Sequence, residues 1–132
     1  MTIKCVLGSI LYMIQPKSLI KLSKKHIAVD LDATLAMYTG FKGVDVIGDP
    51  IKPMIARVKK ELEKGTEVSI LTARAHGWKG KKQQQRAIKA VEEWTKKHIG
   101  KKLFVTAEKH PAFSEIWDDR AKQVVANKGV FK

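Results

Sequence analysis

The chain has 132 residues, of which 44% are hydrophobic and 30% charged, which is enough for one globular domain with a single hydrophobic core. Its one cysteine, Cys5, excludes an intramolecular disulfide framework and a cysteine-paired zinc site, and fits a reducing, cytoplasmic location. The formal net charge of +13 favours association with polyanions, so nucleic acid is a candidate partner. A face of solvated lysines that binds nothing is the alternative.

Residues 1–25 are interpreted as a basic N-terminal extension ahead of a domain that spans residues 26–132. The extension contains five lysines and no acidic residue, which leaves a net charge of +8 for the rest of the chain. Its apolar part, residues 3–14, is too short for a membrane span, which takes about 20 residues. We therefore expect no membrane-spanning segment. A strand, a surface helix and a loose arm all stay open for this part.

The segment His26–Ala36 (HIAVDLDATLA) begins with an apolar run that is typical of a buried strand. Asp30 and Asp32 follow, and alternation along an extended chain places their carboxylates on the same side of the backbone. Two carboxylates this close repel each other unless a cation or a shared proton lies between them, so a purely structural role is costly. For an isolated pair of this kind, a strand end with two solvated acids is the alternative.

The following residues predict a strand–helix–strand unit. Asp49 and Pro50 are typical of a helix N-cap and first helical residue, and an apolar stripe at helical spacing continues to Leu62. Glu67–Leu71 is predicted to be the next strand, which implies parallel strands joined by a right-handed crossover. The sequence GxxxxGK[ST] does not occur, so a P-loop nucleotide site is not indicated.

The second half of the chain repeats this alternation. After a basic loop at residues 75–82, an apolar stripe predicts a helix that ends near Gly100. Strands are expected at residues 103–105 and 116–117, with an edge strand at Val124–Val125. The pattern predicts a three-layer, Rossmann-like α/β domain with a mostly parallel sheet, in which ligands bind beyond the carboxyl ends of the strands.

Four polar motifs occur in a fixed order along these elements. They are the two aspartates after the first strand, Thr72 in ILTAR, Lys109 before His-Pro, and Asp118-Asp119 in EIWDDRAKQVVANKG. In this order the chain resembles the haloacid dehalogenase-like (HAD) hydrolase superfamily, in particular its short phosphatase-like members. Small phage and prophage proteins are similar through GDPIKPMI, ILTAR and EIWDDRAKQVVANKG. The resemblance covers about residues 26–130.

The resemblance implies a Mg²⁺-dependent phosphomonoester hydrolase that acts through an aspartyl-phosphate intermediate. Asp30 would be the nucleophile, and Asp32 would be the general acid and then the general base. The implied metal ligands are the side chains of Asp30 and Asp118 and the backbone carbonyl of Asp32. Asp119 would bind the metal directly, bind it through water, or orient Asp118. The implied partner is a phosphorylated substrate.

Three further side chains are assigned to the same site. Thr72 would donate a hydrogen bond to a phosphate oxygen, although a helix or turn cap is its alternative role. Lys109 would neutralise charge on the nucleophile and the phosphate; Lys101 and Lys102 compete for this role, but Lys109 matches the family spacing. Arg74 would either contact the substrate or stabilise the site.

Two features bear on activity and substrate. Ala33 stands where most phosphatases of the family have glycine, which puts the geometry of the turn in doubt. The gaps between motifs hold no cap domain, so we expect an open site that suits a macromolecular end, or a small substrate closed in by a second subunit of an oligomer. The basic run at residues 79–89 favours a nucleotide or a phosphorylated nucleic-acid end. Trp78 could stack on a base, but packing is the favoured role. A nucleic-acid-binding protein of HAD-like fold with little catalysis is the alternative function.

Overall fold

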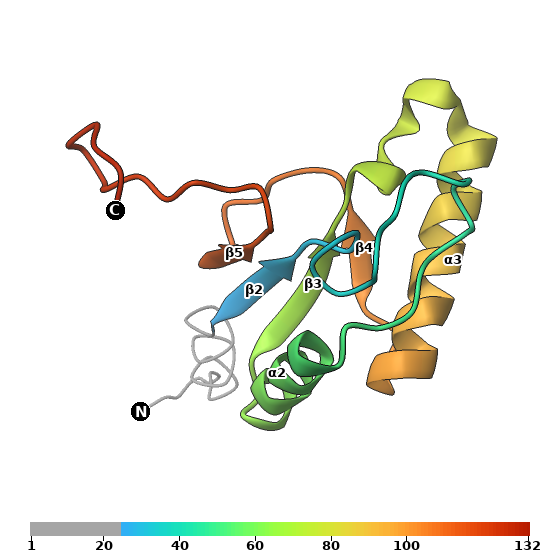
Figure 1. Cartoon of the computed structure of the whole chain (residues 1–132), viewed down its shortest axis with the longest axis horizontal. Helices are drawn as coiled ribbons and strands as arrows, with labels where there is room; N and C mark the ends of the chain where they lie inside the picture. The colour runs from blue at the N-terminus through green and yellow to red at the C-terminus, as the bar shows by residue number, and fades with distance from the viewer. Residues whose placement is uncertain (1–24) are drawn as a thin grey trace, which may run out of the picture.

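The computed structural model describes residues 25–132, so the predicted N-terminal extension lies outside the described residues except for Lys25. One sheet of four parallel strands has the order β4-β3-β2-β5. The strands are β2 (His26–Val29), β3 (Glu67–Leu71), β4 (Phe104–Thr106) and β5 (Glu115–Trp117). Helix α2 (Lys52–Glu63) joins β2 to β3, and α3 (Lys81–Ile99) joins β3 to β4 (Figure 1). The predicted α/β class with a Rossmann-like parallel sheet is confirmed.

The hydrophobic core lies between one face of the sheet and both helices. Ile27 and Val29 of β2 are fully buried, and in the parallel register they share this face with Ile70 of β3. Apolar residues of α2 and α3 belong to the same cluster, and the two helices contact each other. Both helices therefore cover the same face of the sheet, so the described residues form two layers and not the three that the sequence predicts. The buried helix residues are Ile55, Val58, Ala87, Val91, Trp94, Thr95 and Ile99.

The opposite face of the sheet is approached by the segment that joins β4 to β5, residues 107–114. The Phe113 ring packs edge-on against the His26 ring, with centroids 5.0 Å apart. The Nε2 atom of His26 lies 2.8 Å from the Ser69 hydroxyl, within hydrogen-bonding distance. Further along this face, Phe104 is 66% exposed. The chain between β4 and β5 thus runs back to the amino end of β2 without forming a helix.

Helix α2 begins at Lys52, later than expected. Its N-cap is Ile51, and no side chain caps the helix. The predicted cap at Asp49 and Pro50 is wrong because these residues are extended and pair with the segment after β2. The Met37 amide donates to the Asp49 carbonyl at 2.8 Å, and Pro50 forms an antiparallel bridge with that segment.

The end of helix α3 agrees with the sequence prediction, whereas the C-terminal segment does not. Gly100 ends α3 in the left-handed conformation, with φ of 97°, as glycine at that position predicts. The predicted edge strand at Val124–Val125 is wrong. Val124 makes one isolated bridge to Phe131, because positive φ angles at Asn127 and Gly129 turn the chain back onto itself. In residues 25–132, every helix is too short or too polar to cross a membrane.

Candidate active site

The polar residues that follow β2, β3 and β5 meet at one edge of the sheet. Asp30 follows β2, and its amide donates to the carbonyl of Trp117, the last residue of β5, at 2.9 Å. Thr72 follows β3, and its amide donates to the carbonyl of Thr106, the last residue of β4, at 2.9 Å. Because all the strands are parallel, these bonds align four strand ends. The sequence placed Asp30, Thr72 and Asp118 at the same edge, and the structure brings them there.

Asp30, Asp118 and Asp119 form an acidic cluster. Each offers a carboxylate oxygen, and these oxygens all lie within 4.8 Å of one another. Asp30 is half-buried, whereas the other two are exposed. Burial, and next the charge of Asp118, raise the pKa of Asp30 to about 7. The cluster therefore holds closely spaced negative charge that a proton or a cation would relieve.

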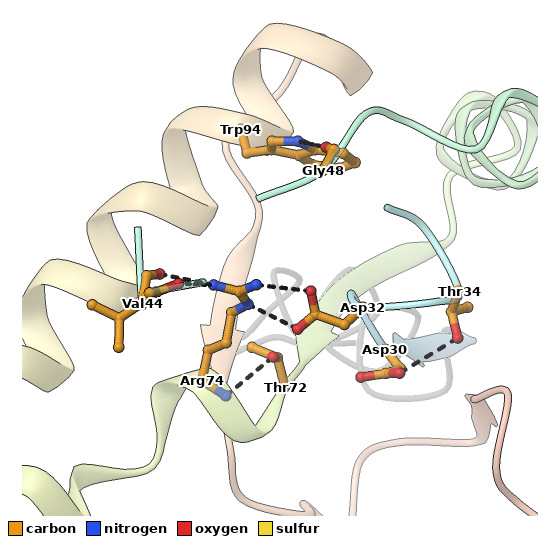
Figure 2. Close-up of polar contacts among 9 residues, drawn as sticks. Asp30, Asp32, Thr34, Val44, Gly48, Thr72, Arg74 and Trp94 are labelled. Atoms are coloured by element: carbon orange, nitrogen blue, oxygen red, sulfur yellow. Dashed lines mark hydrogen bonds and ion pairs between the residues drawn. The ribbon is translucent and has the colours of Figure 1, made fainter. Parts of the chain in front are cut away.

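Thr34 connects two members of the acidic cluster. Its hydroxyl lies 3.4 Å from Asp30 Oδ2 (Figure 2). The same hydroxyl lies 3.3 Å from Asp119 Oδ1 and accepts a hydrogen bond from the Asp119 amide at 3.2 Å. The side chain is only 7% exposed. One hydroxyl proton serves one carboxylate at a time, so Thr34 orients the cluster without neutralising it. Sequence reasoning missed this role, although the spacing Asp-x-Asp-x-Thr was its signal.

Asp32 is turned away from the acidic cluster and toward Arg74. The guanidinium donates from Nε to Oδ2 at 2.8 Å and from Nη2 to Oδ1 at 2.9 Å (Figure 2). It also donates from Nη1 to the carbonyls of Gly43 and Val44, at 2.8 and 3.1 Å. The Arg74 side chain is 4% exposed. These contacts fit the stabilising role that was open for Arg74, and its contact with a substrate stays a prediction.

Thr72 is buried, and its hydroxyl oxygen accepts a hydrogen bond from the Arg74 amide at 3.2 Å. It is therefore the N-cap of the short 3₁₀ helix η1 (Ala73–Ala75), the alternative role that its sequence allowed. The hydroxyl proton remains available as a donor, so the cap and the predicted phosphate contact are compatible. The phosphate contact stays a prediction.

Lys109 is exposed and follows the carboxyl end of β4 by three residues. Lys101 and Lys102 precede β4 and so lie at the opposite, amino end of that strand. Among the described residues, the cations that line the cavity at the site are Arg74, Lys79 and Arg120, not Lys109. The catalytic role of Lys109 stays a prediction.

A cavity of about 600 Å³ opens at this edge of the sheet. It lies within the size range of small-molecule sites. Its walls come from the strand ends, from the segment after β2 and from the turns before α3. The lining residues are Asp30, Asp32, Ala33, Tyr38, Phe41, Val44, Leu71, Thr72, Ala73, Arg74, His76, Trp78, Lys79, Gln83, Gln84, Ala107, Asp118, Asp119 and Arg120.

The segment after β2 is held in a strained turn. Ala33 has φ of 69°, in the left-handed region that glycine adopts more easily. Its amide donates to the Ala36 carbonyl at 2.8 Å, which closes a turn that contains Thr34 and directly follows the two predicted catalytic aspartates. The turn therefore forms with alanine at this position, and the consequence of the alanine is conformational strain.

No family model, curated protein or solved structure matches this chain. The site must therefore be interpreted from its own geometry. The acidic cluster supplies only carboxylate oxygens, the donors that Mg²⁺ prefers. The Arg120 amide donates to Asp118 Oδ1 at 2.7 Å, which fixes that carboxylate and leaves its other oxygen for a ligand. The donor set fits the cation that the sequence predicts.

Proposed function

We propose that the protein is a Mg²⁺-dependent phosphomonoester hydrolase of the HAD type, with Asp30 as nucleophile. The observation that carries the proposal is the convergence of Asp30, Asp118 and Asp119 at the carboxyl ends of β2 and β5, beside a cavity. A scaffold gains nothing from three mutually repelling carboxylates at one edge of the sheet, whereas phosphoryl transfer needs them to hold a cation.

The chemistry divides into two displacements. In the first, an Asp30 oxygen forms a bond to phosphorus, the bond to the leaving oxygen breaks, and Asp32 gives its proton to that oxygen. In the second, Asp32 takes a proton from water, the water oxygen bonds to phosphorus, and Asp30 is released as a carboxylate. Bound Mg²⁺ would supply positive charge beside the phosphoryl oxygens and favour the ionised form of Asp30. Thr72 would donate a hydrogen bond to a phosphoryl oxygen.

The test is phosphate release from a generic aryl phosphate with Mg²⁺. Asp30→Asn should lower turnover by roughly 10³-fold or more, since the amide cannot form the acyl phosphate. Asp49→Asn removes an exposed carboxylate outside the cavity and serves as the matched control. Unchanged turnover in Asp30→Asn would refute the assignment, as would full activity of the wild-type protein in excess EDTA.

The alternative function, nucleic-acid binding with little catalysis, is favoured by one contact. Both oxygens of Asp32 accept hydrogen bonds from Arg74, so the predicted general acid is held toward this guanidinium and away from the acidic cluster. Salt-sensitive binding of DNA or RNA that Asp30→Asn leaves unchanged, with no phosphate release, would support this alternative.

A further inference from the structure

Three exposed aromatic side chains line the cavity. Tyr38, Phe41 and Trp78 are 40%, 57% and 76% exposed. The chain has nine aromatic residues, so a third of them gather at this one place. The packing role predicted for Trp78 is wrong, because most of its ring faces solvent. Large apolar side chains that stay exposed on a concave surface mark a ligand site rather than a core.

Each of two aromatic rings lies beside a cation. Lys79 Nζ is 5.6 Å from the centroid of the Trp78 ring, and Arg74 Cζ is 5.4 Å from that of Phe41. The Trp78 amide also donates to His76 Nδ1 at 3.1 Å, which fixes the turn that carries it. Because Arg74 also holds Asp32, the aromatic wall and the predicted catalytic residues are connected through one guanidinium. Aromatic rings beside cations are the usual platform for single-stranded nucleic acid.

A row of exposed lysines continues from the cavity along the first half of α3. Lys79, Lys81, Lys82 and Lys89 are exposed, and no acidic residue occurs between Gly77 and Val91. No carboxylate of residues 25–132 forms an ion pair with these four lysines. Lys82 and Lys89 are two helical turns apart on the same face of α3, a separation of roughly 10 Å. This length is sufficient for more than one backbone phosphate.

We propose that Tyr38, Phe41 and Trp78 form a base-stacking subsite, and that the substrate is the phosphorylated end of a single-stranded nucleic acid. The terminal base stacks in the subsite, and the next phosphates contact the lysines of α3. The inference rests on the proposed function for the place of the terminal phosphate, at the acidic cluster. A sugar phosphate has no aromatic base to stack, and a mononucleotide has no further phosphates for the lysines.

Binding is measured with the full-length Asp30→Asn protein in Mg²⁺, by fluorescence anisotropy of a labelled, terminally phosphorylated single-stranded oligonucleotide. Trp78→Ala should weaken binding roughly 5- to 150-fold, the range expected for the loss of one stacked base. The matched control is Phe131→Ala, since Phe131 is 63% exposed, has Lys122 Nζ 4.2 Å from its ring centroid, and does not line the cavity. Equal weakening of binding by both substitutions would overturn the subsite, and so would unchanged binding in both variants.

The lysine row is tested in the same assay. Lys82→Ala with Lys89→Ala should weaken oligonucleotide binding and reduce its salt dependence, with a slope smaller by about 1.4 for a single strand. Lys59→Ala with Lys60→Ala, two exposed lysines of α2, is the matched control. An oligonucleotide that binds no more tightly than the corresponding mononucleotide would overturn the polynucleotide assignment.

Phosphate release separates this inference from the proposed function. With the wild-type protein, a phosphorylated oligonucleotide should be hydrolysed with a lower KM than ribose 5-phosphate, and Trp78→Ala should reduce that preference. If ribose 5-phosphate and the oligonucleotide are hydrolysed equally in both proteins, the hydrolase stands and the subsite is wrong. If no substrate is hydrolysed but oligonucleotide binding depends on Trp78, the subsite stands and the hydrolase is wrong.

Discussion

Asp32 and Arg74 form a two-point ion pair, with contacts of 2.8 and 2.9 Å, in which the arginine is 4% exposed. The same guanidinium donates to the carbonyls of Gly43 and Val44. Arg74, three positions after the carboxyl end of β3, therefore ties the predicted acid–base residue to the loop after β2. Turning Asp32 toward a leaving group at the acidic cluster would break at least one of its contacts with Arg74. A phosphate oxygen entering the cavity is the natural replacement acceptor.

The Asp32–Arg74 pair should be strongly coupled in a double-mutant cycle. Removing either partner leaves the other charge buried without its partner, which typically costs about 3–5 kcal/mol, so Arg74→Ala and Asp32→Ala should each lower the free energy of unfolding markedly. The double substitution should cost little more than either single one. Urea denaturation of the four proteins measures this coupling.

Asp45 and Arg86 provide the matched control pair. Their contact is also 2.9 Å, but both side chains are more than half exposed, at 51% and 57%. Solvent screens such a pair, so its coupling should be much the smaller of the two. Similar coupling in the two cycles would show that burial of Arg74 contributes nothing.

Ala33→Gly should stabilise the protein. The left-handed conformation at φ of 69° costs about 1–2 kcal/mol for a residue with a Cβ atom, and glycine removes this cost. Its greater freedom in the unfolded chain offsets about 0.5–1 kcal/mol, so the free energy of unfolding should rise by about 0.5–1 kcal/mol. Chemical denaturation measures the change. Ala90→Gly, inside α3, should have the opposite sign at a similar size, and a loss of stability in both variants would contradict the strain at Ala33.

The sequence predicts well which strands carry the site residues, because the strands follow from the hydrophobic pattern and all run in the same direction. The strand predicted at Glu67–Leu71 is confirmed without change, and the apolar runs before Asp30 and Asp118 become β2 and β5. Parallel strands then bring the residues after them to one edge, whatever the loops do. The order of motifs along the chain is therefore enough to assemble the acidic cluster.

The contacts made by loops could not be predicted in the same way. Asp49 and Pro50 have the local signature of a helix start, yet pairing with the segment after β2 overrides it. The pairing of Asp32 with Arg74 depends on the path of the loop at residues 41–44, and no hydrophobic periodicity predicts that path. The exposure of Trp78 likewise depends on the two turns before α3 rather than on the residues beside it.

Thr34→Val should weaken Mg²⁺ binding without removing a predicted ligand. Valine has nearly the shape of threonine but cannot donate to Asp30 or Asp119, or accept from the Asp119 amide. The loss of such an orienting contact typically costs 10–100-fold in metal affinity. Titration calorimetry with Mg²⁺ measures the dissociation constant, and Thr34→Ser, which keeps the hydroxyl, should retain near wild-type affinity. Equal affinities for the valine and serine variants would contradict an orienting role.

Compared with the wild type, Asp118→Asn should be more stable near pH 7 without Mg²⁺ and less stable with it. Without the cation, burial and the charge of Asp118 hold the pKa of Asp30 at about 7, above its ordinary value of 3.8. The folded protein therefore binds a proton more tightly than the unfolded chain, and its stability should fall as pH rises from about 4 to 7. Asp118→Asn removes the charge repulsion, so the variant should be more stable than the wild type near pH 7, with a shallower fall.

Mg²⁺ should reverse this order. Because the cation binds ionised carboxylates, it should stabilise the wild-type protein increasingly as pH rises toward 7, by about 2.7 kcal/mol at a concentration 100-fold above its dissociation constant. Asp118→Asn loses a ligand and should gain much less. Thermal unfolding at pH 5 and pH 7, with Mg²⁺ or with EDTA, measures all four combinations. Asp49→Asn should follow the wild type throughout, and an Asp118→Asn protein that gains as much from Mg²⁺ as the wild type would remove Asp118 from the metal site.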